Sequence, residues 1–177
     1  LYPMRLLILR QVLYISVQDR LVQEITELMY YNIPCTYMRG GTSRALIFQK
    51  KDLPADKTLW PELFMKALGV RMTAAGLSAM GVDFPTHKIA VISPHEGDDA
   101  DVDFQTDDEN YYVDNRGNCG NMSSAVGPYA IDEGMVEAKE PETIVRIFNT
   151  NTKRIIKSRV LVKNGKSSIE GDTRIHG

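Results

Sequence analysis

Residues 118–132 decide the fold, and they read Asn-Cys-Gly-Asn-Met-Ser-Ser-Ala-Val-Gly-Pro-Tyr-Ala-Ile-Asp. Small side chains dominate from Ser123 to Asp132, as expected of a helix that its neighbours approach closely. Gly127-Pro128 is a local exception, because proline is tolerated in a helix only near its first turn or at a kink. The turn formers at 114–121 predict a loop that leads into this helix. We therefore expect one helix at the centre of the fold.

Short strands are predicted on both sides of this helix. Residues 35–38 and 45–48 flank a glycine-containing turn at 39–43, which predicts a hairpin. A helix is predicted from a cap at Asp56 or Thr58 to Leu68. Further strands are predicted at 88–92, 102–104, 111–113, 143–149, 154–163 and 167–171. The pattern indicates an α+β domain, a mostly antiparallel sheet wrapped around one central helix.

Residues 1–32 are expected to form a helical N-terminal extension. Apolar side chains recur on one helical face between Val17 and Leu28, and the segment that ends in Pro34 would stop the helix. Residues 33–177 are expected to form the domain itself. The chain stops at Gly177 without a closing element, from which we expect a fragment of a longer fold.

Composition limits the class of partner. The formal net charge is −2, so no global basic field would attract nucleic acid. No window of 18 consecutive apolar residues is present, so we expect no membrane span. Cys35 and Cys119 are the two cysteines, too few for a disulfide framework. Two reduced thiols fit a cytoplasmic protein.

Cys119 is the first candidate for chemistry. Its sequence neighbours are glycine and asparagine, whereas a buried core cysteine normally has apolar neighbours. Gly120 follows Cys119 directly and Gly117 lies two positions before it. Glycines on both sides let the backbone approach a ligand closely. If the helix begins just after Gly120, the free amides of residues 121–123 form an anion site, and the helix dipole favours the thiolate. The alternative is an ordinary structural thiol.

Two further segments carry candidate residues. Lys88 opens an apolar strand, where a lysine is usually solvated, although a partly desolvated lysine can act as a base. Arg39-Gly40-Gly41-Thr42-Ser43 resembles a cradle for a carboxylate or phosphate, and a plain hairpin turn is the alternative. It is not a P-loop, because the Gly-Lys-Ser/Thr ending is missing.

No metal site is predicted. The acidic residues between Glu96 and Glu109 lack the ligand register of a calcium loop, so we expect a solvated loop. The three histidines, His87, His95 and His176, show no metal-ligand spacing. With two cysteines, a structural zinc site is not expected.

Three motifs in this order resemble the PrpF family: residues 33–43, 118–130 and 145–152. The resemblance covers residues 33–177. It implies a fold similar to diaminopimelate epimerase, with two similar domains, each a sheet around a central helix, and the active site between them. Family members are about twice as long, so the resemblance implies that the second domain is absent here. The family includes 2-methylaconitate cis–trans isomerase, methylitaconate isomerase and 4-oxalomesaconate tautomerase.

The resemblance also implies roles for individual residues. Cys119 takes the place of the family's active-site cysteine, and Lys88 that of a lysine that opens a strand. Substrate-binding positions are Thr42, Ser43, Asn118, Gly120, Asn121, Met122 and Ser123. The family usually has Thr-Ser-Lys at the lysine, and here His87 replaces the serine. Because of this difference, the resemblance does not identify the substrate.

The resulting hypothesis is a cofactor-independent isomerase that shifts a proton and a double bond in a small unsaturated di- or tricarboxylate. Such chemistry needs a positioned base and fixed positive character for the developing charge. One alternative is a non-catalytic accessory protein on the same fold. Another is an amino-acid racemase or epimerase with a cysteine from each domain, ranked lower because Cys35 lies on the opening strand. The sequence does not decide whether two copies of the protein form a homodimer.

Overall fold

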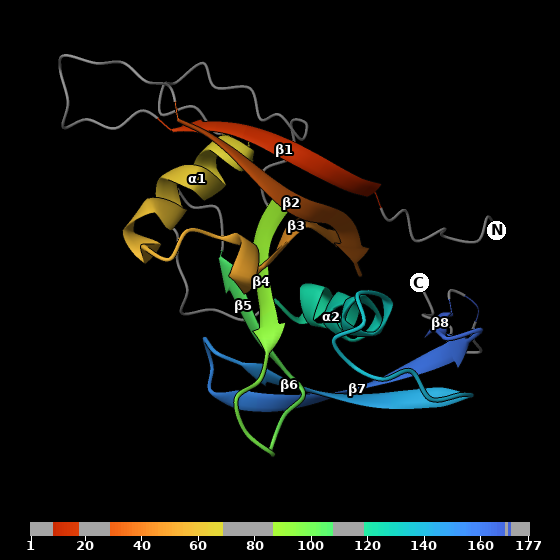
Figure 1. The fold of residues 1–177 in the computed structure, drawn as a ribbon. Helices are drawn as coiled ribbons and strands as arrows, with labels where there is room; N and C mark the ends of the chain where they lie inside the picture. Colours follow the sequence, from red (N-terminus) through yellow and green to blue (C-terminus); the bar gives the residue numbers. More distant parts are fainter. Residues whose placement is uncertain (1–8, 18–28, 69–86, 108–118, 169, 171–177) are drawn as a thin grey trace, which may run out of the picture.

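The computed structural model describes residues 9–17, 29–68, 87–107, 119–168 and 170. Within them, eight strands form a sheet in the order β1 to β8, which curves around helix α2 (Figure 1). The strands are β1 (Leu9–Val17), β2 (Met29–Gly40), β3 (Ser43–Gln49), β4 (His87–Pro94), β5 (Val102–Asp107), β6 (Glu142–Asn149), β7 (Arg154–Lys163) and β8 (Lys166–Ser167). The helices are α1 (Trp60–Ala67) and α2 (Gly120–Asp132), with short 3-10 turns η1 (Lys50–Asp52) and η2 (Lys57–Leu59). The predicted α+β class is confirmed.

Most neighbouring strands are antiparallel, as predicted. The parallel pairs are β3–β4 and β5–β6. Parallel neighbours need a crossover connection, and α1 and α2 lie in these two connections. Among the described residues, no helix is both long and apolar enough to span a membrane.

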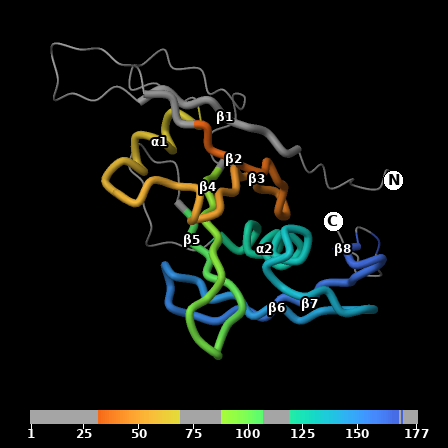
Figure 2. Tube along the Cα trace, in the orientation of Figure 1, coloured from red at the N-terminus to blue at the C-terminus, as the bar shows by residue number. Residues whose placement is uncertain are grey.

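The two helices cover opposite faces of the sheet. Successive side chains of a strand point to opposite faces. On β3, Ala45 and Ile47 belong to the core around α2, whereas Leu46 and Phe48 belong to the core under α1. Figure 2 shows α1 and α2 on either side of β4. We call the face toward α2 the inner face and the other the outer face.

Helix α2 approaches the sheet closely because one of its residues has no side chain. A Cβ built on Gly127 would lie 2.5 Å from Ser158 Oγ and 2.8 Å from Val160 Cγ2, both on β7. Pro128 follows inside the helix. The small residues of α2 therefore bring its backbone against β7, and the predicted central helix is confirmed.

Gly127→Ala is expected to lower the free energy of unfolding by about 1–3 kcal/mol, because the methyl group overpacks the contact with β7. A better helix propensity, at most about 1 kcal/mol, offsets part of this cost. Urea unfolding measures the difference. Gly120→Ala is the matched control, since no other heavy atom of the described residues, apart from its chain neighbours and its own helix backbone, lies within 4 Å of its built Cβ. If the two variants were equally stable, α2 would not approach β7 this closely.

The expected N-terminal helix is wrong for the described residues. Residues 9–17 form β1, and β2 begins at Met29, so the two strands pair from Leu9↔Tyr37 to Val17↔Met29. β-branched and aromatic residues such as Val12 and Tyr14 suit a strand, and β2 offers an open edge to pair with. Residues 18–28, which carried most of the helical spacing, lie outside the described residues.

The other predicted elements have mixed outcomes. The strands predicted at 35–38, 45–48, 88–92, 102–104, 143–149 and 154–163 are confirmed. The helix predicted at 56–68 is confirmed as η2 followed by α1, with Asp56 accepting from the Thr58 amide at 2.9 Å. The strand predicted at 167–171 is reduced to β8, with 169 and 171 outside the described residues. Residues 111–113 also lie outside them.

The acidic run is more than a solvated loop. Glu96, Asp98 and Asp99 are exposed, as expected. Asp101, however, accepts from the Arg146 backbone and guanidinium at 2.6 Å each. Partial burial alone would raise the pKa of Asp101, but the hydrogen bonds from Arg146 hold it below its usual value. The carboxylate therefore fixes the 95–101 loop to β6.

Candidate active site

Cys119 is the N-cap of α2. Its backbone is extended, with φ −97° and ψ 100°, and its Sγ accepts from the Met122 amide at 3.5 Å. The Cys119 carbonyl accepts from the amide of Ser123 at 2.9 Å and from its hydroxyl at 3.0 Å. The residue is 9% exposed. A cysteine takes the place of the usual Ser, Thr, Asp or Asn cap, so the first turn of α2 fixes the thiol.

The hairpin turn between β2 and β3 brings two hydroxyls to this helix start. The Cys119 thiol donates to Ser43 Oγ at 3.7 Å, and Ser43 is buried at the first residue of β3. Asn121 Nδ2 donates to Thr42 Oγ1 at 3.0 Å. The predicted pocket residues Thr42 and Ser43 thus meet Cys119 and Asn121.

Two glycines make this meeting sterically possible. A Cβ on Gly40 would clash with the Asn121 carbonyl and lie 3.1 Å from Met122 Cα. Gly41 has φ +55°, in the left-handed region that favours glycine. Strand β2 continues to Gly40, so the turn is shorter than predicted and consists of Gly41 and Thr42. The glycines serve contact with the helix start rather than a free cradle.

Lys88 lies at the same edge of the sheet. It pairs with Ala45 in the parallel register of β3 and β4, and both Ala45 and Ala90 pack in the core around α2. Paired residues and residues two apart share a face, so the half-buried Lys88 points to the inner face, as does Ser43. Because β3 and β4 are parallel, their N-terminal ends lie at the same end of the sheet, and Ser43 and Lys88 both lie there.

The helix-start amides differ from the prediction by one residue. Residues 121–123 were expected to offer their amides to an anion, but Met122 and Ser123 donate theirs to Cys119. The first-turn amides that Cys119 does not engage are those of Gly120 and Asn121. The reason is that Cys119 is the cap, so α2 begins at Gly120, inside the predicted loop. Asn118 lies outside the described residues.

Cys35 does not face Cys119. Cys35 belongs to the core under α1 on the outer face, whereas Cys119 belongs to the core around α2. Burial raises the pKa of the Cys35 thiol to about 11, so it stays protonated at neutral pH. Within the described residues, the two thiols cannot form the facing pair that a two-cysteine racemase needs.

The third motif, at 145–152, is structural. Asn149 is fully buried, and its Oδ1 accepts from the Asn151 amide at 3.0 Å and the Thr152 amide at 2.8 Å. Asn151 Nδ2 in turn donates to the Thr106 carbonyl at 2.7 Å. This asparagine turn fixes the β6–β7 hairpin to β5, a role that Asn-Thr-Asn-Thr after a strand could have signalled.

Comparison with known proteins gives a consistent result. Residues 30–177 match the family described as "PrpF protein". The chain is 42% identical over 148 residues to 3-methylitaconate isomerase of Eubacterium barkeri, covering 82% of this chain and 39% of that protein. It is 39% identical over 148 residues to 4-oxalomesaconate tautomerase of Pseudomonas putida, covering 82% and 41%. A crystal structure of methylitaconate-delta-isomerase superposes with a TM-score of 0.72 at 42% identity, covering 81% of this chain and 38% of that one. The chain thus spans about 40% of the length of these relatives.

Proposed function

Because this chain belongs to the PrpF protein family, we propose that the protein carrying it is an isomerase of a small unsaturated di- or tricarboxylate. The family resemblance of residues 33–177 is confirmed by the match over residues 30–177. The relatives are named as isomerases and tautomerases of methylitaconate and oxalomesaconate. The proposal covers this class of carboxylate, and the experiment below distinguishes the individual substrates.

One observation supports the proposal: Cys119 contacts Ser43, and Lys88 lies near the start of the neighbouring strand on the same inner face. Cys119 and Ser43 are in contact at 3.7 Å, although 76 positions separate them in the sequence. Lys88 is the second residue of the next strand, β4, and points to the same face. A thiol, a hydroxyl and an amine beside a helix start combine two proton carriers with fixed positive character.

The proposed reaction is a balanced transfer of one proton. The amine of Lys88 takes a proton from a carbon next to the conjugated system, and the electron pair moves into a dienolate. The amides of Gly120 and Asn121 and the Ser43 hydroxyl hold the developing negative charge. The Cys119 thiol then gives its proton to a different carbon, which relocates the double bond. Proton transfer from the Lys88 ammonium to the thiolate restores both groups.

Solvent deuterium exchange tests the proposal. The protein that contains this chain is incubated in deuterium oxide with methylitaconate, methylaconitate and oxalomesaconate, and NMR follows deuterium in the carbon skeleton. We expect incorporation into at least one of them. Lys88→Ala is expected to slow it about 100-fold, within the usual contribution of a general base.

Lys157→Ala is the control, because Lys157 is an exposed lysine on β7, far from the β3–β4 edge. Equal exchange by Lys88→Ala and the parent protein would show that Lys88 is not the base. No exchange into any candidate by the parent protein would favour the accessory-protein reading instead.

A further inference from the structure

A separate hollow of about 260 Å³ opens on the outer face of β4 and β5. Its floor consists of two cross-strand pairs, Val91 with Gln105 and Ser93 with Asp103. Val91 belongs to the core under α1, whereas Lys88 points to the inner face. The hollow and the candidate active site therefore lie on opposite faces of β4.

Two walls of the hollow are held in place by hydrogen bonds. On one side, Trp60 lines the hollow while its indole Nε1 donates to the Pro54 carbonyl at 2.8 Å. On the other side, the turn after β6 is fixed to β5, because the Thr150 amide donates to the Phe104 carbonyl at 2.9 Å. The shape of the hollow is thus set by the fold and needs no ligand to form it.

Three lysines reach this hollow from three different segments: Lys50 in η1, Lys57 in η2 and Lys153 in the β6–β7 turn. Two of them lie near aromatic rings, with Lys57 Nζ 5.3 Å from the centre of the Trp60 ring and Lys153 Nζ 5.9 Å from that of Phe148. Such cation–π contacts hold ammonium groups at the rim.

The charge of the lining is unbalanced. Among the described residues that line the hollow, Asp103 is the one carboxylate against the three lysines. Its Oδ1 is already engaged by His95 Nδ1 at 2.6 Å. Like charges brought together repel one another, and an anion between them would relieve that repulsion.

We propose that this hollow binds a small multivalent oxyanion, held by Lys50, Lys57 and Lys153. Its volume lies below the roughly 300–1,000 Å³ of pockets for drug-sized ligands, so a compact anion fits. Lysine acts as a point charge, and both phosphate and a short polycarboxylate satisfy it. An adjoining hollow of about 610 Å³ has two lysines, Lys50 and Lys51, against two carboxylates, Glu96 and Asp103. This balance makes it a poorer anion site than the hollow with three lysines and one carboxylate.

Site-resolved lysine acetylation tests this proposal on the chain as it exists. The protein is acetylated with and without inorganic phosphate or propane-1,2,3-tricarboxylate, at constant ionic strength, and mass spectrometry gives the rate at each lysine. We expect at least one of the anions to slow acetylation of Lys50, Lys57 and Lys153 about threefold or more. The two arms show whether a phosphate or a carboxylate is the ligand.

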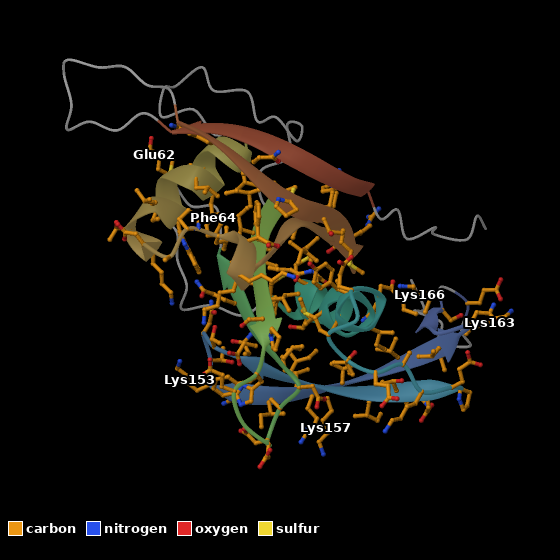
Figure 3. The ribbon with its side chains drawn as sticks, in the orientation of Figure 1. Glu62, Phe64, Lys153, Lys157, Lys163 and Lys166 are labelled. Atoms are coloured by element: carbon orange, nitrogen blue, oxygen red, sulfur yellow. The ribbon has the colours of Figure 1, made fainter. Side chains whose placement is uncertain are left out.

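Lysines outside the hollow provide the internal control. Figure 3 shows Lys153 at one end of the β6–β7 hairpin and Lys163 at the other. Equal slowing at Lys163 would reveal a bulk ionic effect and overturn the proposal, as would an absence of protection with both anions. Protection of Lys88 alone would place the anion on the inner face and also overturn it.

A substitution gives the second test. Titration calorimetry of the anion that protects these lysines is expected to show about tenfold weaker binding to Lys153→Gln than to the parent chain. Lys163→Gln removes the same charge from an exposed position on the same hairpin and is expected to leave the affinity unchanged. Equal weakening by both substitutions would show that net charge, not this hollow, governs binding.

Discussion

Phe64→Ala is expected to lower the free energy of unfolding by about 3–5 kcal/mol, as for large aromatic truncations in protein cores. Phe64 is 1% exposed and points from α1 into the outer-face core (Figure 3). Its ring centre lies 5.6 Å from that of Phe48 on β3 and 5.8 Å from that of Trp60. Helix α1 has eight residues, too few to be stable without packing, so loss of this ring loosens the whole crossover.

Glu62→Ala in the same helix is the control for this prediction. Glu62 is exposed and pairs with Lys66 at 2.8 Å, one helical turn away. An exposed pair of this kind contributes at most about 0.5 kcal/mol. Urea unfolding of both variants gives the comparison. A loss below about 1 kcal/mol for Phe64→Ala would mean that α1 does not seal the outer-face core.

Local signals were sufficient to predict most of the fold. The strands around residues 149–152 alternate with a period of two, and the apolar strands around residues 39–43 flank a glycine turn, so each hairpin is specified by nearby residues. The N-terminal segment misled for the opposite reason. Most of its helical spacing lies in residues 18–28, outside the described residues, whereas residues 9–17 form β1 by pairing with β2, a long-range contact that no local pattern contains.

The candidate site could be predicted only in part. Glycine and asparagine around Cys119 predict a helix start at this position without any knowledge of the fold, and α2 begins at Gly120. The contact with Ser43 depends on how the β2–β3 hairpin meets α2, which no local pattern contains. The amides were assigned one residue too late, because helix boundaries read from sequence are uncertain by a residue or two.

Cys119→Ser is expected to slow turnover of the carboxylate substrate about 10³-fold while leaving the protein folded. A hydroxyl is a much weaker acid than a thiol, so it gives up a proton poorly to the dienolate. Serine is also a better N-cap than cysteine, so it should keep the hydrogen bond from the Met122 amide that Cys119 Sγ now accepts. Loss of activity with retained or higher stability would separate the chemistry of this residue from its structural role.

The second thiol supplies the matched control for that experiment. Cys35→Ala removes a thiol whose pKa burial raises to about 11, and which lies on the outer face, away from Ser43 and Lys88. Its turnover is expected to equal that of the parent protein, with a stability loss of about 1 kcal/mol for the emptied volume. Deuterium exchange and urea unfolding of both variants decide the matter. Full activity in Cys119→Ser would show that the substrate does not receive its proton from the thiol. The role of Cys119 would then be to cap α2.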